Sequence, residues 1–168
     1  MSIHITPNSK SLQIRPTSKE QLRSIVQDEV RRQGSDADLN FIDTSLITDM
    51  SSLFIDLHPK NIKVDEWDVS NVTNMRQLFM NCGDLVANLS AWDVSNVTDM
   101  YAMFFNCYSF NSDLSAWDVS NVKNTRYMFY RCYALNTDLS NWKLKTGCFT
   151  NDMFTEADNQ RIPSWYRF

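Results

Sequence analysis

The sequence predicts an α/β fold, a solenoid of about five strand-helix units of 25 residues each, preceded by an N-terminal capping helix. The first observation is a repeated string: WDVSNVTNM recurs as WDVSNVTDM and WDVSNVKNT, with tryptophans at Trp67, Trp92, Trp117 and Trp142. The second is that phenylalanine, methionine and cysteine columns keep the same 25-residue spacing. Self-similarity at a period of roughly 20 to 50 residues indicates stacked repeats.

The N-terminal element is predicted to be one amphipathic helix between Thr17 and Gly34. Thr17 or Ser18 suits its N-cap, and Gly34 suits the left-handed residue that follows a helix. Stacked repeats expose apolar edges at both ends, so we expect this helix to cover the first unit. Its apolar residues recur on one helical face: Leu22, Ile25, Val26 and Val30.

Each unit divides into two halves with different periods. Leu89, Trp92 and Val94 precede the turn-prone pair Ser95 and Asn96, which favours a short strand entering a turn. Equivalent strands are expected to pair in parallel along the stack. The second half favours a short helix, because its apolar residues follow i, i+3, i+4, i+7 spacing: Met100, Met103, Phe104 and Cys107.

Three segments are expected along the chain. Residues 1–38 form an N-terminal segment with the capping helix, 39–154 the repeat solenoid, and 155–168 a C-terminal cap or tail. The first and last units depart from the consensus, as terminal repeats do. The tail is expected to fold its apolar residues over the last unit: Ile162, Trp165 and Phe168.

Composition excludes some functional classes. The chain of 168 residues carries a formal net charge of -4 and has no basic run, so no direct binding of nucleic acid is expected. Its start lacks a basic region followed by an apolar one, and no apolar stretch approaches the ~18 residues of a membrane span. We therefore expect a cytoplasmic protein without a membrane span.

The cysteines are expected to be free. Three of the four share one repeat register, so they stack as neighbours and form no close pair of the CxxC kind that zinc sites use. Cys148 lies outside this register and is expected to be the most accessible thiol. The buried register comprises Cys82, Cys107 and Cys132.

No catalytic constellation is evident in the sequence. His4 and His58 are the only histidines, and neither has a serine or cysteine nucleophile at a recognisable spacing. The chain has no glycine-rich phosphate loop, HExxH motif or EF-hand pattern. We expect no enzyme activity, no metal and no cofactor.

From about Asp38 to Phe154 the units resemble the BspA-type leucine-rich repeats of bacterial surface antigens. They are most similar to the mycoplasma-lipoprotein type of repeat, whose hallmark is WDVSNVTNM followed by MF and a cysteine. The resemblance implies a right-handed leucine-rich-repeat-like solenoid that serves adhesion or protein binding without catalysis. The sequence differs from secreted members in lacking a signal peptide or lipid-anchor cysteine near its start. One unit matches the hallmark in order: Leu89, Trp92, Val94, Val97, Met100, Met103, Phe104 and Cys107.

An aspartate column is the first candidate site. Asp68, Asp93 and Asp118 repeat at 25-residue spacing after Asp43, and the column ends at Lys143. One interpretation is that each carboxylate caps its own turn. The other is an acidic stripe, reinforced by nearby acidic residues, that receives a basic partner or mimics a run of phosphates.

An aromatic column set on the predicted helical halves is the second candidate. Arg126 and Arg131 flank it, and tyrosine and arginine are favoured at interface hot spots, although packing between neighbouring units would also explain the rings. The sequence thus predicts a non-catalytic protein-protein interaction module whose partner is another protein. The alternative is an acidic-surface inhibitor or decoy acting on a nucleic-acid-handling enzyme. The aromatic candidates are Tyr101, Phe105, Tyr108, Tyr127, Tyr130 and Tyr133.

Overall fold

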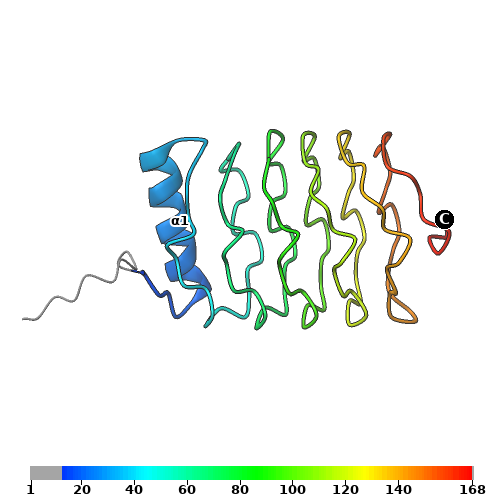
Figure 1. Ribbon diagram of the computed structural model, residues 1–168, viewed down its shortest axis with the longest axis horizontal. Helices are drawn as coiled ribbons and strands as arrows, with labels where there is room; N and C mark the ends of the chain where they lie inside the picture. The colour runs from blue at the N-terminus through cyan, green and yellow to red at the C-terminus, as the bar shows by residue number, and fades with distance from the viewer. Residues whose placement is uncertain (1–12, 168) are drawn as a thin grey trace, which may run out of the picture.

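A computed structural model describes residues 13–167 and places one helix, α1 (Lys19–Gln33), at one end of a series of side-by-side chain passages (Figure 1). We call each passage a winding. Backbone hydrogen bonds join windings with offsets of 24 to 26 residues. His4 and Phe168, and with them part of the predicted N- and C-terminal segments, lie outside the described residues. The first to fifth windings span 42–66, 67–91, 92–116, 117–141 and 142–166.

Helix α1 begins and ends at the residues that the sequence favours as caps. The Ser18 hydroxyl accepts a hydrogen bond from the N–H of Gln21 at 3.3 Å. At the other end Gly34 has a φ of 81°, and its N–H donates to the carbonyl of Val30 at 2.9 Å. A β-carbon would be strained at that φ, which explains the glycine.

The first winding contacts α1 through the helix's long basic side chains. Lys19 donates from Nζ to the Ser51 hydroxyl at 2.5 Å, and Arg23 donates to the carbonyl of Ser52. Leu22 is fully buried on the same helix. Side chains of the helix therefore donate hydrogen bonds to backbone and side-chain acceptors of the first winding, at the N-terminal end of the stack (Figure 1).

The prediction that the second half of each unit is a short helix is wrong, because these halves are pairs of β-turns. In the run 100–107, an N–H to carbonyl bond of 3.2 Å closes the turn 100–103 and one of 3.0 Å closes 104–107. Ala102 and Asn106, the third residues of these turns, have φ values of 51° and 59°, which a right-handed helix does not contain. A turn brings its first and fourth residues close together. Two successive turns thus bury i, i+3, i+4 and i+7, the same spacing as one helical face.

The predicted strand halves are also wrong. Turns close between Leu89 and Trp92 at 3.1 Å and between Val94 and Val97 at 2.9 Å. Parallel pairing between windings is reduced to isolated bridges, so residues 13–167 contain α1 and no extended strand. The α/β strand-helix solenoid is therefore replaced by stacked windings made of turns. One column of bridges joins all five windings: Asp49 with Asn74, Asn74 with Asp99, Asp99 with Asn124, and Asn124 with Phe149.

Backbone hydrogen bonds along the turn runs join each winding to the next. In the second winding, alternate N–H groups of the run 75–82 donate to carbonyls 24 residues further along the chain. Two of these bonds run from Met75 to Asp99 at 2.9 Å and from Phe79 to Met103 at 2.9 Å. The windings therefore satisfy backbone groups that a regular sheet or helix would otherwise pair.

The core is a file of stacked side chains inside the windings. Trp92 is 4% exposed, and its indole stacks on that of Trp67 with ring centroids 6.4 Å apart. Phe104 is fully buried between Phe79 and Phe129, at centroid distances of 5.7 and 5.6 Å. Aromatic contacts of this kind stabilise a core by about 0.5–1.5 kcal/mol beyond the area they bury.

The cysteine column lies in this core as free thiols. Cys82, Cys107 and Cys132 are buried, and each Sγ donates to a phenylalanine carbonyl of the previous winding, at 3.0 to 3.3 Å. Burial raises the pKa of the Cys82 thiol to about 12. Cys148 is only partly buried. These cysteines act as small apolar residues in the stack.

Candidate protein-interaction surfaces

Four of the predicted aromatic residues form one cluster on the outside of the third and fourth windings. Phe105 and Tyr130 occupy equivalent positions one winding apart, and their rings stack with centroids 4.7 Å apart. Tyr127 meets both edge-on, at 6.4 and 6.1 Å, and also meets Tyr101 at 5.9 Å. All four side chains are half-buried. The turn runs bring these residues together because each run turns its first and fourth residues inward and leaves others outside.

The remaining two aromatics form a second, more exposed pair. Tyr108 and Tyr133 stack with ring centroids 5.4 Å apart and are 43% and 38% exposed. The position one winding before Tyr108 is Gly83, where a β-carbon would lie 3.0 Å from Cδ2 of the Tyr108 ring. The Tyr108 ring can pack at this position because Gly83 has no side chain. We call the cluster and this pair together the aromatic face.

Arginines and one glutamate frame the aromatic face. The guanidinium carbon of Arg76 lies 3.9 Å from the centroid of the Tyr101 ring, a cation–π contact between the second and third windings. Arg131 pairs with Glu156 at 2.9 Å, and the Tyr130 hydroxyl donates to the same carboxylate at 3.0 Å. That hydrogen bond raises the pKa of Tyr130, and the hydrogen bond from Arg131 lowers the pKa of Glu156.

The aspartate column lies at turns on exposed positions. Asp68 accepts hydrogen bonds from the N–H and the hydroxyl of Ser70, at 3.0 and 2.6 Å. Asp93 and Asp118 make the equivalent backbone contacts to the serines two residues later, both at 3.0 Å. Hydrogen bonds from those serine side chains lower the pKa values of Asp93 and Asp118. One oxygen of each carboxylate is thus engaged within its own turn, and the side chain remains exposed.

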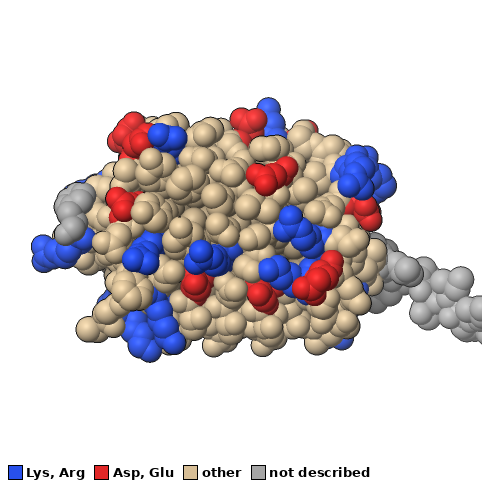
Figure 2. Space-filling view, turned by 180° about the vertical axis from the view of Figure 1, so that it is seen from behind, with Lys and Arg blue, Asp and Glu red and all other residues tan. Residues whose placement is uncertain are grey.

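Basic residues bound the aspartate column at both ends. Before it, Asp43 pairs with Arg15 at 3.1 Å. After it, Lys143 takes the equivalent position in the fifth winding and is exposed. The acidic stripe is therefore limited to the second, third and fourth windings. On the face seen in Figure 2, acidic and basic side chains are intermingled, with uncharged surface between them.

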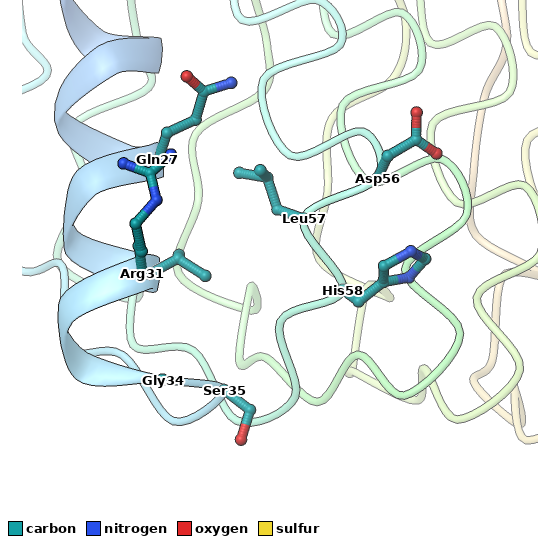
Figure 3. Close-up of a pocket in the computed structure, with 8 residues that line it drawn as sticks. Gln27, Arg31, Gly34, Ser35, Asp56, Leu57 and His58 are labelled. Atoms are coloured by element: carbon teal, nitrogen blue, oxygen red, sulfur yellow. The ribbon is translucent and has the colours of Figure 1, made fainter.

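A cleft of about 410 Å³ lies between the C-terminal half of α1 and residues 56–58 (Figure 3). Its lining includes Arg31 and His58. Leu57 points toward the helix, whereas the side chains of Asp56 and His58 point away from it. A catalytic site requires titratable side chains that converge on one point, and those around this cleft do not converge.

Three residues at or near the aromatic face were not predicted as contributors from the sequence. Arg76 packs on Tyr101, and Glu156 joins Tyr130 to Arg131, but both partners lie about 25 residues away and in different windings. A third is Phe149, which is 57% exposed, with the guanidinium carbon of Arg126 5.1 Å from its ring centroid. The available signal for Phe149 was a phenylalanine in a column that otherwise holds Asp or Asn.

Residues 13–167 contain neither a candidate metal site nor a helix that could span a membrane. No group of three or more His, Cys, Asp or Glu side chains in this range could hold a metal ion. Within the same residues, no helix has the length and apolar character needed to cross a membrane.

The stacked windings and their open outer faces define a chain built from successive turns around a single core. The chain belongs to the family described as "Mycoplasma protein of unknown function, DUF285", whose profile matches residues 22–82 and 48–165. The predicted membership in the BspA-type leucine-rich repeats is wrong, because the family that matches is this one and the windings lack strand-helix units. No curated protein and no solved structure matches the chain.

Proposed function

We propose that this chain is a non-catalytic protein-binding module that uses the aromatic face. The supporting observation is the exposed pair Tyr108 and Tyr133, 43% and 38% accessible, beside an aromatic cluster that Arg76 flanks. Tyrosines bury large area at low entropic cost when they bind, and arginine adds charged donors. The rings already pack between windings, which holds them in fixed positions before a partner arrives.

Pre-organisation supports this proposal over a role in packing alone. A ring held by its neighbour in the free protein loses little freedom on binding. Packing between windings needs only the buried faces of Tyr108 and Tyr133, which leaves their exposed edges and hydroxyl groups for contacts with a partner. A protein with a complementary apolar and acidic surface is the kind of partner that fits.

The experiment is a paired capture from the native host. Immobilised wild-type protein and a Tyr108→Ala/Tyr133→Ala variant are exposed to the same lysate, and the captured proteins are quantified. The proposal expects at least one protein to be enriched on the wild type and depleted on the variant. Ala116→Ser, at an exposed alanine outside the aromatic face, is the control. Identical captured sets on all three forms contradict the proposal.

The acidic decoy is the second candidate, and one observation favours it: Asp68, Asp93 and Asp118 are exposed. Its stripe covers three windings and ends at Lys143, which limits its reach. Binding through it would weaken steeply with salt and would depend on all three carboxylates. Neutralising them as Asn, which retains an acceptor oxygen for each turn, tests this role. An unchanged affinity in the triple variant excludes it.

A further inference from the structure

Two arginines of the same register flank Tyr101 on the outside of the windings. Arg76 lies one winding before Tyr101, and Arg126 lies one winding after it. Backbone hydrogen bonds join the three passages at this point: Gln77 donates to the Tyr101 carbonyl at 2.8 Å. Ala102 donates in the same way to the Arg126 carbonyl at 2.9 Å. Passages bonded like this lie about 4.8 Å apart, so the two arginines repeat at about 9.6 Å.

Each arginine packs on an aromatic ring of the following winding. The guanidinium carbon of Arg76 lies 3.9 Å from the centroid of the Tyr101 ring, and that of Arg126 lies 5.1 Å from the centroid of the Phe149 ring. Both side chains therefore lean in the same direction along the stack, which preserves the two-winding separation of their guanidinium groups. Stacking on a ring also restrains each guanidinium before a partner binds.

Most donors of these two guanidinium groups are free for an anionic partner. Within residues 13–167, the Arg76 guanidinium donates to no protein acceptor and forms no ion pair. Arg126 donates in the same range only from Nε, to the side chain of Asn151 at 3.5 Å. By contrast, Arg131 is paired with Glu156 at 2.9 Å. Arg76 and Arg126 are thus the arginines of this face that can pair with carboxylates of a partner.

The separation of the two arginines favours one backbone conformation for a bound segment with two acidic residues. In a polyproline II helix, residues i and i+3 lie on the same side about 9.3 Å apart, close to the two-winding repeat. In a β-strand, residues on one face recur every ~6.7 Å, and an α-helix places i and i+4 about 6 Å apart. Polyproline II segments also bind aromatic-lined surfaces in other proteins, as an aromatic cluster beside the arginines would require.

We propose that the aromatic face binds an acidic, proline-rich segment of another protein, in the polyproline II conformation and laid along the stack across the third winding. Acidic residues at i and i+3 pair with Arg76 and Arg126. The prolines between them pack on Tyr101 and Tyr127, which are half-buried and meet edge-on at 5.9 Å. A preformed polyproline II backbone loses little entropy on binding. This partner rests on the protein-binding role proposed above and gives that role a chemical class of ligand.

The probe for the test is a fluorescent, blocked peptide of sequence PPEPPEPP, titrated with the full chain and followed by anisotropy. We expect saturable binding that weakens at least about tenfold in Arg76→Ala/Arg126→Ala. PPEPEPPP has the same composition but places its glutamates at i and i+2. It should bind about fivefold more weakly, because only one ion pair can then form. Lys145→Glu, at an exposed lysine of the fifth winding, should bind PPEPPEPP as the wild type does.

Charge exchange distinguishes ion pairing from a general loss of structure. PPKPPKPP should bind Arg76→Glu/Arg126→Glu better than it binds the wild type, and unchanged thermal unfolding confirms that the variant is folded. No saturable binding of PPEPPEPP, or equal binding of the two glutamate peptides, overturns the proline-rich partner. Capture on the wild type and on Tyr108→Ala/Tyr133→Ala then decides the protein-binding role separately. A captured protein lost on that variant leaves the role standing, whereas identical captured sets contradict it.

Discussion

The indole nitrogen of Trp92 donates a hydrogen bond to the carbonyl oxygen of Val64, 2.9 Å away and 28 positions earlier in the chain. Trp67, Trp117 and Trp142 make the same bond to Leu39, Leu89 and Leu114, at 2.9 to 3.0 Å. Each tryptophan thus fills the core and also gives a second hydrogen bond to a carbonyl that already accepts from the backbone N–H closing its turn. Tryptophan thus contributes a hydrogen-bond donor as well as its size at this position, which Ile42 fills without a donor in the first winding.

Trp92→Phe should lower the free energy of unfolding by about 0.5–1.5 kcal/mol, since it removes one of the two hydrogen bonds to the Val64 carbonyl and leaves the one from the N–H of Trp67. Urea denaturation followed by circular dichroism measures this change. Trp165→Phe is the matched comparison: Trp165 makes the same kind of bond to Leu139 at 2.7 Å but is only half-buried. A larger loss at Trp165 than at Trp92 would contradict this account of the indole bond.

Asp152→Gly should raise the free energy of unfolding by about 0.5–1 kcal/mol, because Asp152 has a φ of 57° that glycine adopts without strain. Asp158 has a negative φ and is equally exposed, so Asp158→Gly should lower the stability by a similar amount. Thermal or urea unfolding of both variants compares them. If the turn run were instead a helix, both substitutions would destabilise the protein.

The thiols should react in a fixed order. Burial raises the pKa values of the thiols of Cys82, Cys107 and Cys132. It also raises the pKa of Cys148, which is only partly buried. Less of a thiol with a raised pKa is deprotonated at pH 8, and only the thiolate reacts. A colourimetric thiol reagent should therefore modify Cys148 first in the folded protein and all four cysteines in urea. Rapid native modification of Cys107, which is fully buried, would contradict the packed column.

The stability contributed by Asp93 should depend on pH. Hydrogen bonds from Ser95 lower the pKa of Asp93 in the folded protein, so its carboxylate stabilises the fold above about pH 4, the unfolded value. That contribution is lost as the pH falls through the folded pKa. Ser95→Ala should raise the pKa of Asp93 in an NMR titration and should reduce stability at neutral pH.

The destabilisation by Ser95→Ala should disappear in acid, where Asp93 is protonated in both forms. Ser109→Ala, at an exposed serine with no aspartate partner, is the control and should leave the pKa of Asp93 unchanged. A stability difference that persists unchanged below about pH 2 would show that Ser95 acts through something other than this carboxylate.

Helix α1 was predictable because its signals are local. Ser18 and Gly34 mark its ends in the sequence, and the predicted span of Thr17 to Gly34 differs from Lys19–Gln33 only at the termini. The turn runs were not predictable from apolar spacing, since two turns and one helical face bury the same positions. Asn81 and Asn106 were the available signal, because asparagine tolerates positive φ better than most residues.

The positions of the aromatic candidates in the chain were predictable, but their contacts were not. Phe105 and Tyr130 share a register, so their proximity follows from the 25-residue spacing. The edge-on contacts of Tyr127 arise because its backbone has a φ of 57°, which redirects the side chain toward the cluster. The residue type at this position does not predict the side-chain direction, because the same register holds serine, glutamine and alanine in other windings.

The most direct test of the central claim, protein binding through the aromatic face, is the dissociation constant of a captured partner for three forms of the chain. These are the wild type, Tyr108→Ala/Tyr133→Ala, and Lys145→Glu, which changes an exposed lysine of the fifth winding outside the aromatic face. Loss of two hot-spot tyrosines should weaken binding by at least about thirtyfold, or ~2 kcal/mol. The account predicts that loss for the tyrosine variant and near wild-type affinity for Lys145→Glu. Full affinity in a folded tyrosine variant would contradict it.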